Sequence, residues 1–212
     1  MFWDKFKRVH CVENGCFCES VRQGIIAQPS ASLSMLPVIF LGIYILLKEK
    51  RIFPKMLGIS TLILGVGSLV FHATMTHLGA TLDWLGMYLV ILTFLLWSLN
   101  EYKKLSERQN IILLLTLGLF FTTISFFQMT WGREIFGGIL LLTLLLNIKS
   151  FKKRKQKAKY YALGIITFFL AFGLHQLDEK RIICSPNSLF QLHSFWHFFI
   201  ALAIYFYYKY KL

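Results

Sequence analysis

The sequence predicts an all-α fold: a polytopic membrane protein built as a bundle of seven transmembrane helices. Hydrophobic residues make up 56% of the 212 positions, and the mean hydropathy is +0.59. Charged residues make up only 16%, whereas about a quarter of the residues in ordinary soluble domains are charged. Mostly apolar runs, each near the roughly 20 residues that a helix needs to cross hydrocarbon, recur along the chain. They cover residues 32–48, 56–75, 80–98, 111–128, 134–148, 160–176 and 190–208.

The basic residues alternate between successive loops. The chain holds 23 Lys and Arg against 10 Asp and Glu, a formal net charge of +13. The N-terminal tail and the even-numbered loops contain 7 of the basic residues, and the odd-numbered loops with the C-terminus contain 16. This sorting indicates membrane topology rather than a nucleic-acid partner, with the N-terminus outside and the C-terminus in the cytoplasm. The most basic cytoplasmic loop, from Lys149 to Lys159, is expected to contact anionic lipid head groups.

The chain divides into a short tail and one membrane domain. Residues 1–30 lack the compact apolar core of a cleavable signal peptide, so we expect them to remain as an extramembrane tail, with the first long helix as an uncleaved signal anchor. Residues 31–212 form the seven-helix domain, because the loops leave no room for a second one. A multi-pass protein of this kind belongs in the plasma or inner membrane of a bacterium, or in the ER or Golgi of a eukaryote.

Five polar side chains lie inside or at the edges of these apolar segments. Placing a polar side chain in a membrane costs free energy, so its presence there indicates a function. Ser68 and His72 are four residues apart, as are His193 and His197, so each pair shares one face of its helix. Asp83 opens the third predicted helix. With the predicted orientation, all five lie in one layer near the outer face. Two imidazoles one turn apart make half a zinc site, and the alternative is that the histidines merely bond helix to helix.

Three segments of the chain resemble motifs of one known family. GSLVFHATMTHLGATLDWLGM contains the serine and histidine spaced by four, followed by the aspartate, and CSPNSLFQLHSFWHFFIALA contains the two histidines spaced by four. CESVRQGIIAQPSASLSM precedes the first helix. These segments are similar to the corresponding motifs of the alkaline ceramidases, members of the CREST superfamily of seven-helix membrane hydrolases. The resemblance spans the whole chain and keeps the order of the motifs.

The resemblance implies that His72, His193 and His197 are three zinc ligands and that Ser68 and Asp83 are the other polar groups of the active site. Three neutral imidazoles leave a fourth position for a water molecule whose pKa falls to about 7. In the mechanism that we infer, hydroxide attacks the amide carbonyl, Asp83 takes and later delivers the proton, and zinc and Ser68 stabilise the oxyanion. The products are a fatty acid and an amino-alcohol base from a ceramide-like N-acyl lipid.

The N-terminal segment departs from the family pattern. Ala31 and Ser32, then Ser34 and Met35, stand where the family has an Asn-Thr pair and a Ser-Asn pair. Eukaryotic members bind calcium in this tail, and only Glu19 carries over to that site. Glu13, Asn14 and Gln28 are looser candidates. Calcium takes six or more oxygen ligands, which this stretch does not supply, so a calcium site is doubtful. Glu19 is therefore a candidate either for calcium binding or for a structural role.

The four cysteines, Cys11, Cys16, Cys18 and Cys184, all fall on the side assigned as outer, where conditions permit disulfides. We expect a Cys18–Cys184 bridge that braces the seventh helix. Four cysteines allow three full pairings, and the sequence does not choose among them.

The other three histidines are not expected to bind the metal. His10 and His77 are interpreted as solvated or interfacial side chains. His175 lies at the outer end of the sixth predicted helix, and we expect it to pair with the carboxylate of Asp178 or Glu179, with lining of the site entrance as the alternative.

Three other functions compete with the metal-dependent hydrolase. Ser68, His72 and Asp83 match the residue types of a serine-hydrolase triad, but no nucleophile elbow surrounds Ser68. A lipid-responsive receptor related to the progestin and adiponectin receptors would share the seven helices and zinc site, and it predicts a sizeable cytoplasmic signalling segment. A metal transporter would distribute its ligands across the bilayer, whereas these histidines gather at one end.

Overall fold

Helices make up most of the computed structural model, which describes residues 6–9 and 17–212 and, except for 129 and 149–153, their side chains. The first long helix consists of α1 (Pro29–Leu33) and α2 (Leu36–Lys48) in direct succession. Two short 3₁₀ helices, η3 (Met129–Trp131) and η4 (Lys155–Lys157), flank α6. The predicted all-α class is confirmed, since these residues contain a single isolated β-bridge and no strand. The remaining helices are α3 (Ile52–Thr74), α4 (His77–Lys103), α5 (Glu107–Phe127), α6 (Gly132–Lys153), α7 (Ala158–Glu179) and α8 (Leu192–Lys211).

Five of the seven predicted spans are long and apolar enough to cross a membrane, within the part of the chain that the structure describes. They are the α1–α2 helix, α3, α4, α5 and the helix that includes α7. Of the other two predicted spans, α6 includes residues 149–153, whose side chains lie outside the described part of the structure, and α8 carries two histidines and four tyrosines, which lower its hydropathy. The seven-span count therefore stays a prediction.

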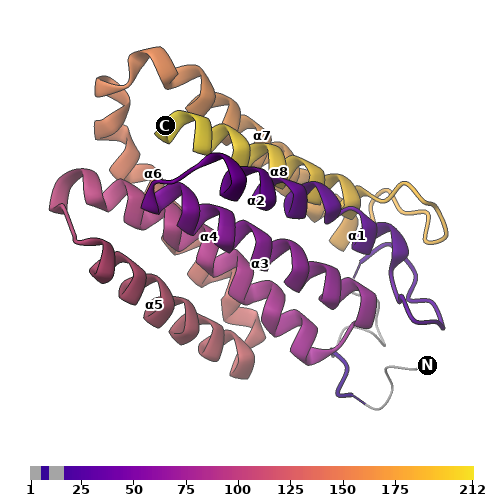
Figure 1. Ribbon diagram of the computed structural model, residues 1–212. Helices are drawn as coiled ribbons and strands as arrows, with labels where there is room; N and C mark the ends of the chain where they lie inside the picture. Colours follow the sequence, from indigo (N-terminus) through magenta and orange to yellow (C-terminus); the bar gives the residue numbers. More distant parts are fainter. Residues whose placement is uncertain (1–5, 10–16) are drawn as a thin grey trace.

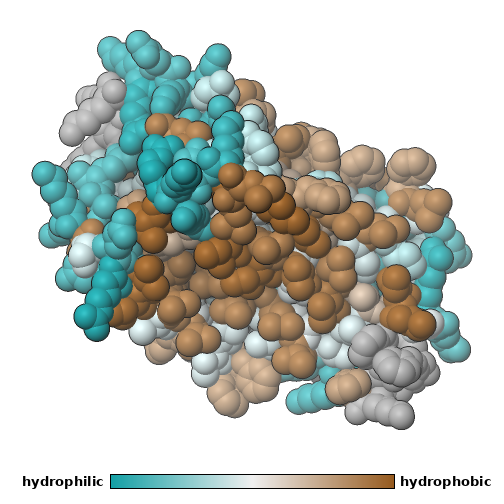
Figure 2. Space-filling model, in the orientation of Figure 1, coloured by the Kyte–Doolittle hydropathy of each residue, from teal (hydrophilic) through white to brown (hydrophobic). Residues whose placement is uncertain are grey.

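The long helices lie side by side as a bundle (Figure 1). α4 packs against α3, α5 and α6, and α8 packs against α7 and α2. The core between them contains fully buried aromatic and aliphatic side chains such as Tyr88, Leu92 and Tyr208. Figure 2 shows a broad hydrophobic band across the middle of the visible face, between hydrophilic ends. Many large apolar side chains are exposed, among them Leu47 and Phe120, and such a surface is suited to lipid.

Two glycines allow α3 and α4 to touch backbone to backbone. A Cβ atom at Gly86 would collide with the Leu64 backbone, and one at Gly67 would lie 2.6 Å from the carbonyl oxygen of Leu82. Small residues at such crossings are typical of helices packed within membranes. The close crossing brings the polar residues that follow Gly67 and Leu82 to the same level of the bundle.

The N-terminal tail is hydrogen-bonded to the end of α3. The last carbonyls of a helix have no partner within the helix. Here the N–H of Ala27 donates to Ala73 O at 2.8 Å, and the N–H of Gln28 donates to His72 O at 3.0 Å. A small apolar cluster of tail, α3 and α4 residues packs around this junction: Val9, Ala27, Phe71, Met75 and Ala80. The tail therefore lies against the end of the bundle.

Asp178, near the end of α7, joins the tail to α8. This side chain is fully buried, and its two oxygens accept the N–H of Cys18 at 3.0 Å and the N–H of His193 at 3.1 Å. A Cys18–Cys184 disulfide, with an S–S distance of 2.15 Å, ties the tail to the α7–α8 loop beside it. This is the pairing expected from the sequence. The two hydrogen bonds and the disulfide together hold the start of α8 against the tail.

We expect Asp178→Asn to lower the free energy of unfolding by about 2 kcal/mol, because an amide cannot accept both N–H groups and one stays buried without a partner. Thermal unfolding in detergent measures the change. Glu179→Gln is the matched control, since the Glu179 carboxylate is partly exposed and pairs with Arg133 at the surface. Its effect should stay below about 1 kcal/mol. Equal losses in both variants would contradict the role given to Asp178.

Candidate metal centre

Three buried histidines from two helices meet at one end of the bundle. His72 lies in the last turns of α3, and His193 and His197 lie one turn apart at the start of α8. Their side chains are 1%, 3% and 4% exposed. One ligand atom from each lies within 4.8 Å of the other two, and the Nε2 atoms of His72 and His193 are 3.2 Å apart. The spacing of four residues thus directs both α8 imidazoles toward the His72 ring near the end of α3.

Gln28 fixes the orientation of the His72 ring. The Gln28 amide donates through Nε2 to the carbonyl of Glu19 at 2.9 Å, which leaves Oε1 facing His72 Nδ1 at 2.9 Å. Because an amide oxygen only accepts, His72 Nδ1 carries the proton and donates it. The lone pair of His72 therefore lies on Nε2, the atom that faces His193.

Ser34 fixes the orientation of the His197 ring. The Ser34 hydroxyl donates its hydrogen to Ala31 O at 2.7 Å, and His197 Nδ1 lies 2.6 Å from the hydroxyl oxygen. Since that hydrogen is already used, His197 Nδ1 is the donor and its Nε2 atom keeps a free lone pair. An oxygen that accepts from the second nitrogen of a ligating imidazole is the usual support of a metal-bound histidine.

These residues fit a metal ion. Tetrahedral zinc with Zn–N bonds of 2.0–2.1 Å places two ligating nitrogens about 3.3 Å apart, close to the separation of the His72 and His193 Nε2 atoms. Without an ion, a proton on His193 Nε2 can be donated to the lone pair of His72 Nε2, whereas a bound ion would accept a lone pair from each of these atoms. The Nδ1 atom of His193 is buried without a hydrogen-bond partner in the described structure, and the Phe17 ring covers the imidazole at a centroid distance of 4.0 Å. The group could therefore hold an ion shielded from water on the tail side.

Ser68 and Asp83 form a polar pair beside this group. Ser68 is buried one turn before His72 on α3, and the carboxyl of the half-buried Asp83 on α4 interacts with the Ser68 side chain across the Gly67 contact. Asp83 does not belong to the group of described residues whose ligand atoms lie within 4.8 Å of one another. The structure thus gathers three histidines and, next to them, a serine and a carboxylate.

Glu19 caps α1 in this structure. Its two carboxylate oxygens accept the backbone N–H of Ser30 at 2.8 Å and of Ala31 at 2.9 Å, where the helix dipole favours a negative charge. Burial raises the pKa of Glu19 above its usual range, and these two N–H bonds partly offset the rise. Gln28, considered from the sequence for calcium, is instead engaged with His72 and Glu19. Glu13 and Asn14 lie outside the described residues.

The remaining histidines and cysteines were also considered from the sequence. The His175 ring lies beside His193 at a centroid distance of 5.2 Å, and its Nδ1 atom lies 3.9 Å from a Glu179 oxygen. His77 packs edge-on against Phe126. Neither belongs to the three-histidine group. His10, Cys11 and Cys16 lie outside the part of the chain that the structure describes.

Comparison with known proteins matches residues 16–211 to the family model described as Ceramidase. The alkaline ceramidase of Drosophila melanogaster is 26% identical over 156 residues, which cover 68% of this chain and 54% of that protein. Alkaline ceramidase 1 of Homo sapiens is 25% identical over 150 residues, with 67% and 57% covered. A putative alkaline ceramidase of Dictyostelium discoideum, dcd3A, is 26% identical over 171 residues, with 69% and 59% covered.

The matched segments span more than half, but less than two thirds, of each of these relatives. The family model, in contrast, covers nearly the whole of this chain, from the tail that carries Glu19 to the end of α8. It includes every helix that contributes to the three-histidine group. The chain belongs to the ceramidase family.

Proposed function

We propose that this protein is a zinc-dependent membrane amidohydrolase. It cleaves the amide bond of ceramide-like N-acyl lipids and releases a fatty acid and an amino-alcohol (sphingoid) base. The observation that carries the proposal is the group of three buried histidines, two of them with Nδ1 engaged by an oxygen so that the Nε2 lone pair is available to an ion, in a chain of the ceramidase family.

His72, His193 and His197 would hold the ion. Zinc bound by three imidazoles keeps a fourth position for water, lowers the pKa of that water to about 7 and polarises a carbonyl oxygen. We prefer zinc because the ligand set is entirely imidazole, although iron, copper and nickel also accept such ligands, and elemental analysis of the purified protein distinguishes them. Gln28 and Ser34 orient two of the rings through their Nδ1 atoms.

Asp83 and Ser68 supply the proton transfer and the polar contact to the substrate. As water attacks the amide carbonyl and the C–O bond forms, Asp83 takes a proton from the water. As the C–N bond breaks, Asp83 delivers that proton to the leaving nitrogen. The Ser68 hydroxyl donates to the carbonyl oxygen, where negative charge develops. The position of Ser68 on the His72 face of α3 and its interaction with Asp83 support these roles.

The substrate class rests on the relatives and on the surface of the bundle. The three relatives are named as alkaline ceramidases, and a ceramide is an N-acyl lipid whose amide lies between two hydrocarbon chains. The apolar band of Figure 2 would keep the protein in a bilayer, where such a lipid resides. An N-acyl sphingoid base is therefore the first substrate to test.

We further propose that seven helices cross the membrane, with the N-terminus and the tail of residues 1–30 outside and the C-terminus in the cytoplasm. The described part of the tail and the α7–α8 loop lie at one end of the bundle, and η4 with the C-terminus lies at the other (Figure 1). The basic loop from Lys149 to Lys159 would then contact anionic head groups on the cytoplasmic face. This orientation places the histidines near the outer leaflet of a plasma, inner, ER or Golgi membrane.

We expect His193→Ala to abolish both bound zinc and fatty-acid release, because two imidazoles do not complete the ligand set. Elemental analysis of the purified protein and release of fatty acid from an N-acyl sphingosine measure the two effects. His77→Ala is the control and should retain both, since His77 lies apart from the group. A wild-type protein without metal, or a His193→Ala variant with full activity, would refute the proposal.

We expect Gln28→Leu to weaken zinc binding by about 10- to 100-fold, since His72 loses the acceptor that orients its ring. Competition with a chelator of known affinity measures the dissociation constant of the ion. Gln23→Leu makes the same chemical change at an exposed position of the tail and should leave that constant unchanged. Equal zinc affinity in the two variants would show that Gln28 has no part in the site.

The proposed orientation predicts the behaviour of reporters fused after Leu212. A fluorescent protein that folds only in the cytoplasm should fluoresce there, and an alkaline phosphatase that folds only outside should be inactive. The same reporters placed before Met1 should give the opposite pattern. Phosphatase activity at the C-terminus would overturn the orientation, and one pattern at both ends would exclude an odd number of spans.

A further inference from the structure

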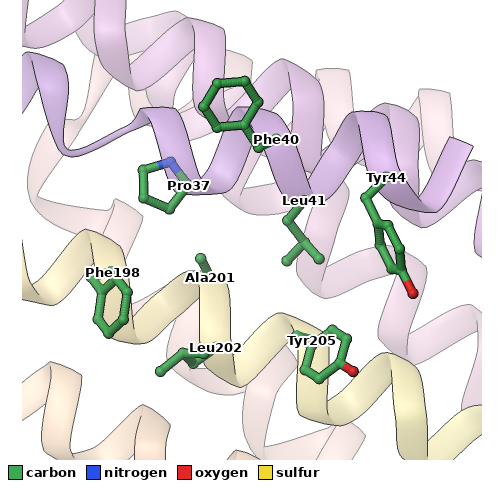
Figure 3. Close-up of a pocket in the computed structure, with 8 residues that line it drawn as sticks. All are labelled: Pro37, Phe40, Leu41, Tyr44, Phe198, Ala201, Leu202 and Tyr205. Atoms are coloured by element: carbon green, nitrogen blue, oxygen red, sulfur yellow. The ribbon is translucent and has the colours of Figure 1, made fainter. Parts of the chain in front are cut away.

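An apolar groove lies between α2 and α8 on the surface of the bundle (Figure 3). Its volume is about 320 Å³, and the side chains of Phe40, Tyr44 and Phe198 on its rim are between 42% and 63% exposed. The lining contains no charged residue. It consists of Pro37, Phe40, Leu41 and Tyr44 from α2 and Phe198, Ala201, Leu202 and Tyr205 from α8.

The groove begins about one helical turn beyond the three-histidine group. His197, Ala201 and Tyr205 are spaced by four along α8, so the face that starts with the candidate ligand continues as a wall of the groove. On the opposite side, Ser34 precedes Pro37 by one turn, and its hydroxyl lies 2.6 Å from His197 Nδ1. This hydrogen bond marks the end of the groove nearest the histidines. From there the groove follows both helices for about 10 Å, at 1.5 Å per residue.

Ala201 creates the hollow at the middle of the groove. It is the smallest lining side chain on α8, and in Figure 3 it lies between Phe198 and Tyr205 while Leu41 faces the same space from α2. A larger side chain at this position would fill the space. At the far end the Tyr44 hydroxyl accepts a hydrogen bond from Lys48 at 2.8 Å, so the walls become polar there.

We propose that this α2–α8 groove binds the N-acyl chain of the substrate and sets the preferred length of that chain. The inference rests on the proposed hydrolysis of an N-acyl lipid at the three histidines. A carbonyl carbon held there carries its acyl chain by a direct bond, whereas the chain of the amino-alcohol base starts several bonds further away on the other side of the nitrogen. The α2–α8 groove, which begins about one turn beyond His197, is therefore close enough to receive the acyl chain, and the α3–α4 groove lined by Gly67 and Leu82 is the competing site.

Crosslinking tests the location without requiring hydrolysis. The probe is an N-acyl sphingosine with a diazirine in the middle of its acyl chain, photolysed with the full-length protein in lipid nanodiscs and mapped by mass spectrometry. We expect adducts within residues 37–44 and 198–205. Two comparison probes carry the diazirine in the sphingoid chain or in the acyl chain of a phosphatidylcholine. Equal labelling of these residues by either comparison probe would overturn the assignment, as would labelling by the N-acyl probe at the α3–α4 groove around Val66 and Leu82 instead.

Ala201→Phe tests the selectivity. We expect it to reduce adduct formation and turnover for N-stearoyl sphingosine at least about tenfold, and to change those for N-hexanoyl sphingosine less than about twofold. Ala162→Phe makes the same change at an exposed position of α7 and should alter neither. Leu41→Phe narrows the groove from α2 and should act like Ala201→Phe, so the test survives if one variant folds poorly. Zinc content shows that the metal centre is intact.

The outcomes separate this inference from the proposed activity. Adducts in the groove without any fatty-acid release would support the groove and refute the hydrolase. Fatty-acid release with equal sensitivity of both chain lengths to Ala201→Phe and Leu41→Phe, at full zinc content, would support the hydrolase and overturn the role of the groove.

Discussion

Three imidazole rings buried at one end of an apolar bundle need a partner for nearly every ring nitrogen, and much of the surrounding structure supplies those partners. A buried polar atom without a hydrogen bond is costly, so the rings can remain inside only where other groups bond to them. Gln28 and Ser34 reach the Nδ1 atoms of His72 and His197 from the segment that leads into the first long helix. That segment is in turn fixed by its backbone bonds to α3. The position of the tail and the state of the histidines therefore depend on each other.

The parts of the site that follow from helix periodicity could be predicted from the sequence. A spacing of four residues places Ser68 with His72, and His193 with His197, whatever the details of packing. The all-α class followed from the apolar composition in the same way. Asp83 was placed near the group by its position at the start of a helix, and the structure adds that Gly67 lets α4 come close enough for Ser68 to reach it.

The groups that support the histidines could not be predicted, because they lie on irregular backbone or act through it. Gln28 was considered only for calcium, and Ser34 only as a departure from the family pattern. No local pattern marks a side chain whose partner is more than 40 residues away. Asp178 was named as a partner for His175, but its oxygens accept backbone N–H groups of the tail and α8. In the sequence Asp178 is recognisable only as a carboxylate at the end of an apolar helix, and that position does not show which N–H groups it accepts. The polar content of α8, which the histidines require, also lowers the hydropathy by which a span is recognised.

The distance along the chain between the two halves of the histidine group has a consequence for biosynthesis. His72 and His193 are separated by 121 residues, and the cysteines that close the tail onto the last loop are separated by 166. Contacts between such distant segments form only after the intervening chain has been made and a long loop has been closed. During translation the tail and α3 leave the ribosome early, with Gln28 beside a solitary histidine. Assembly must then wait until α8 arrives beside them. A nascent chain interrupted before α8 would hold one imidazole of the three, so ribosomes that stall late would leave molecules that cannot assemble the three-histidine group.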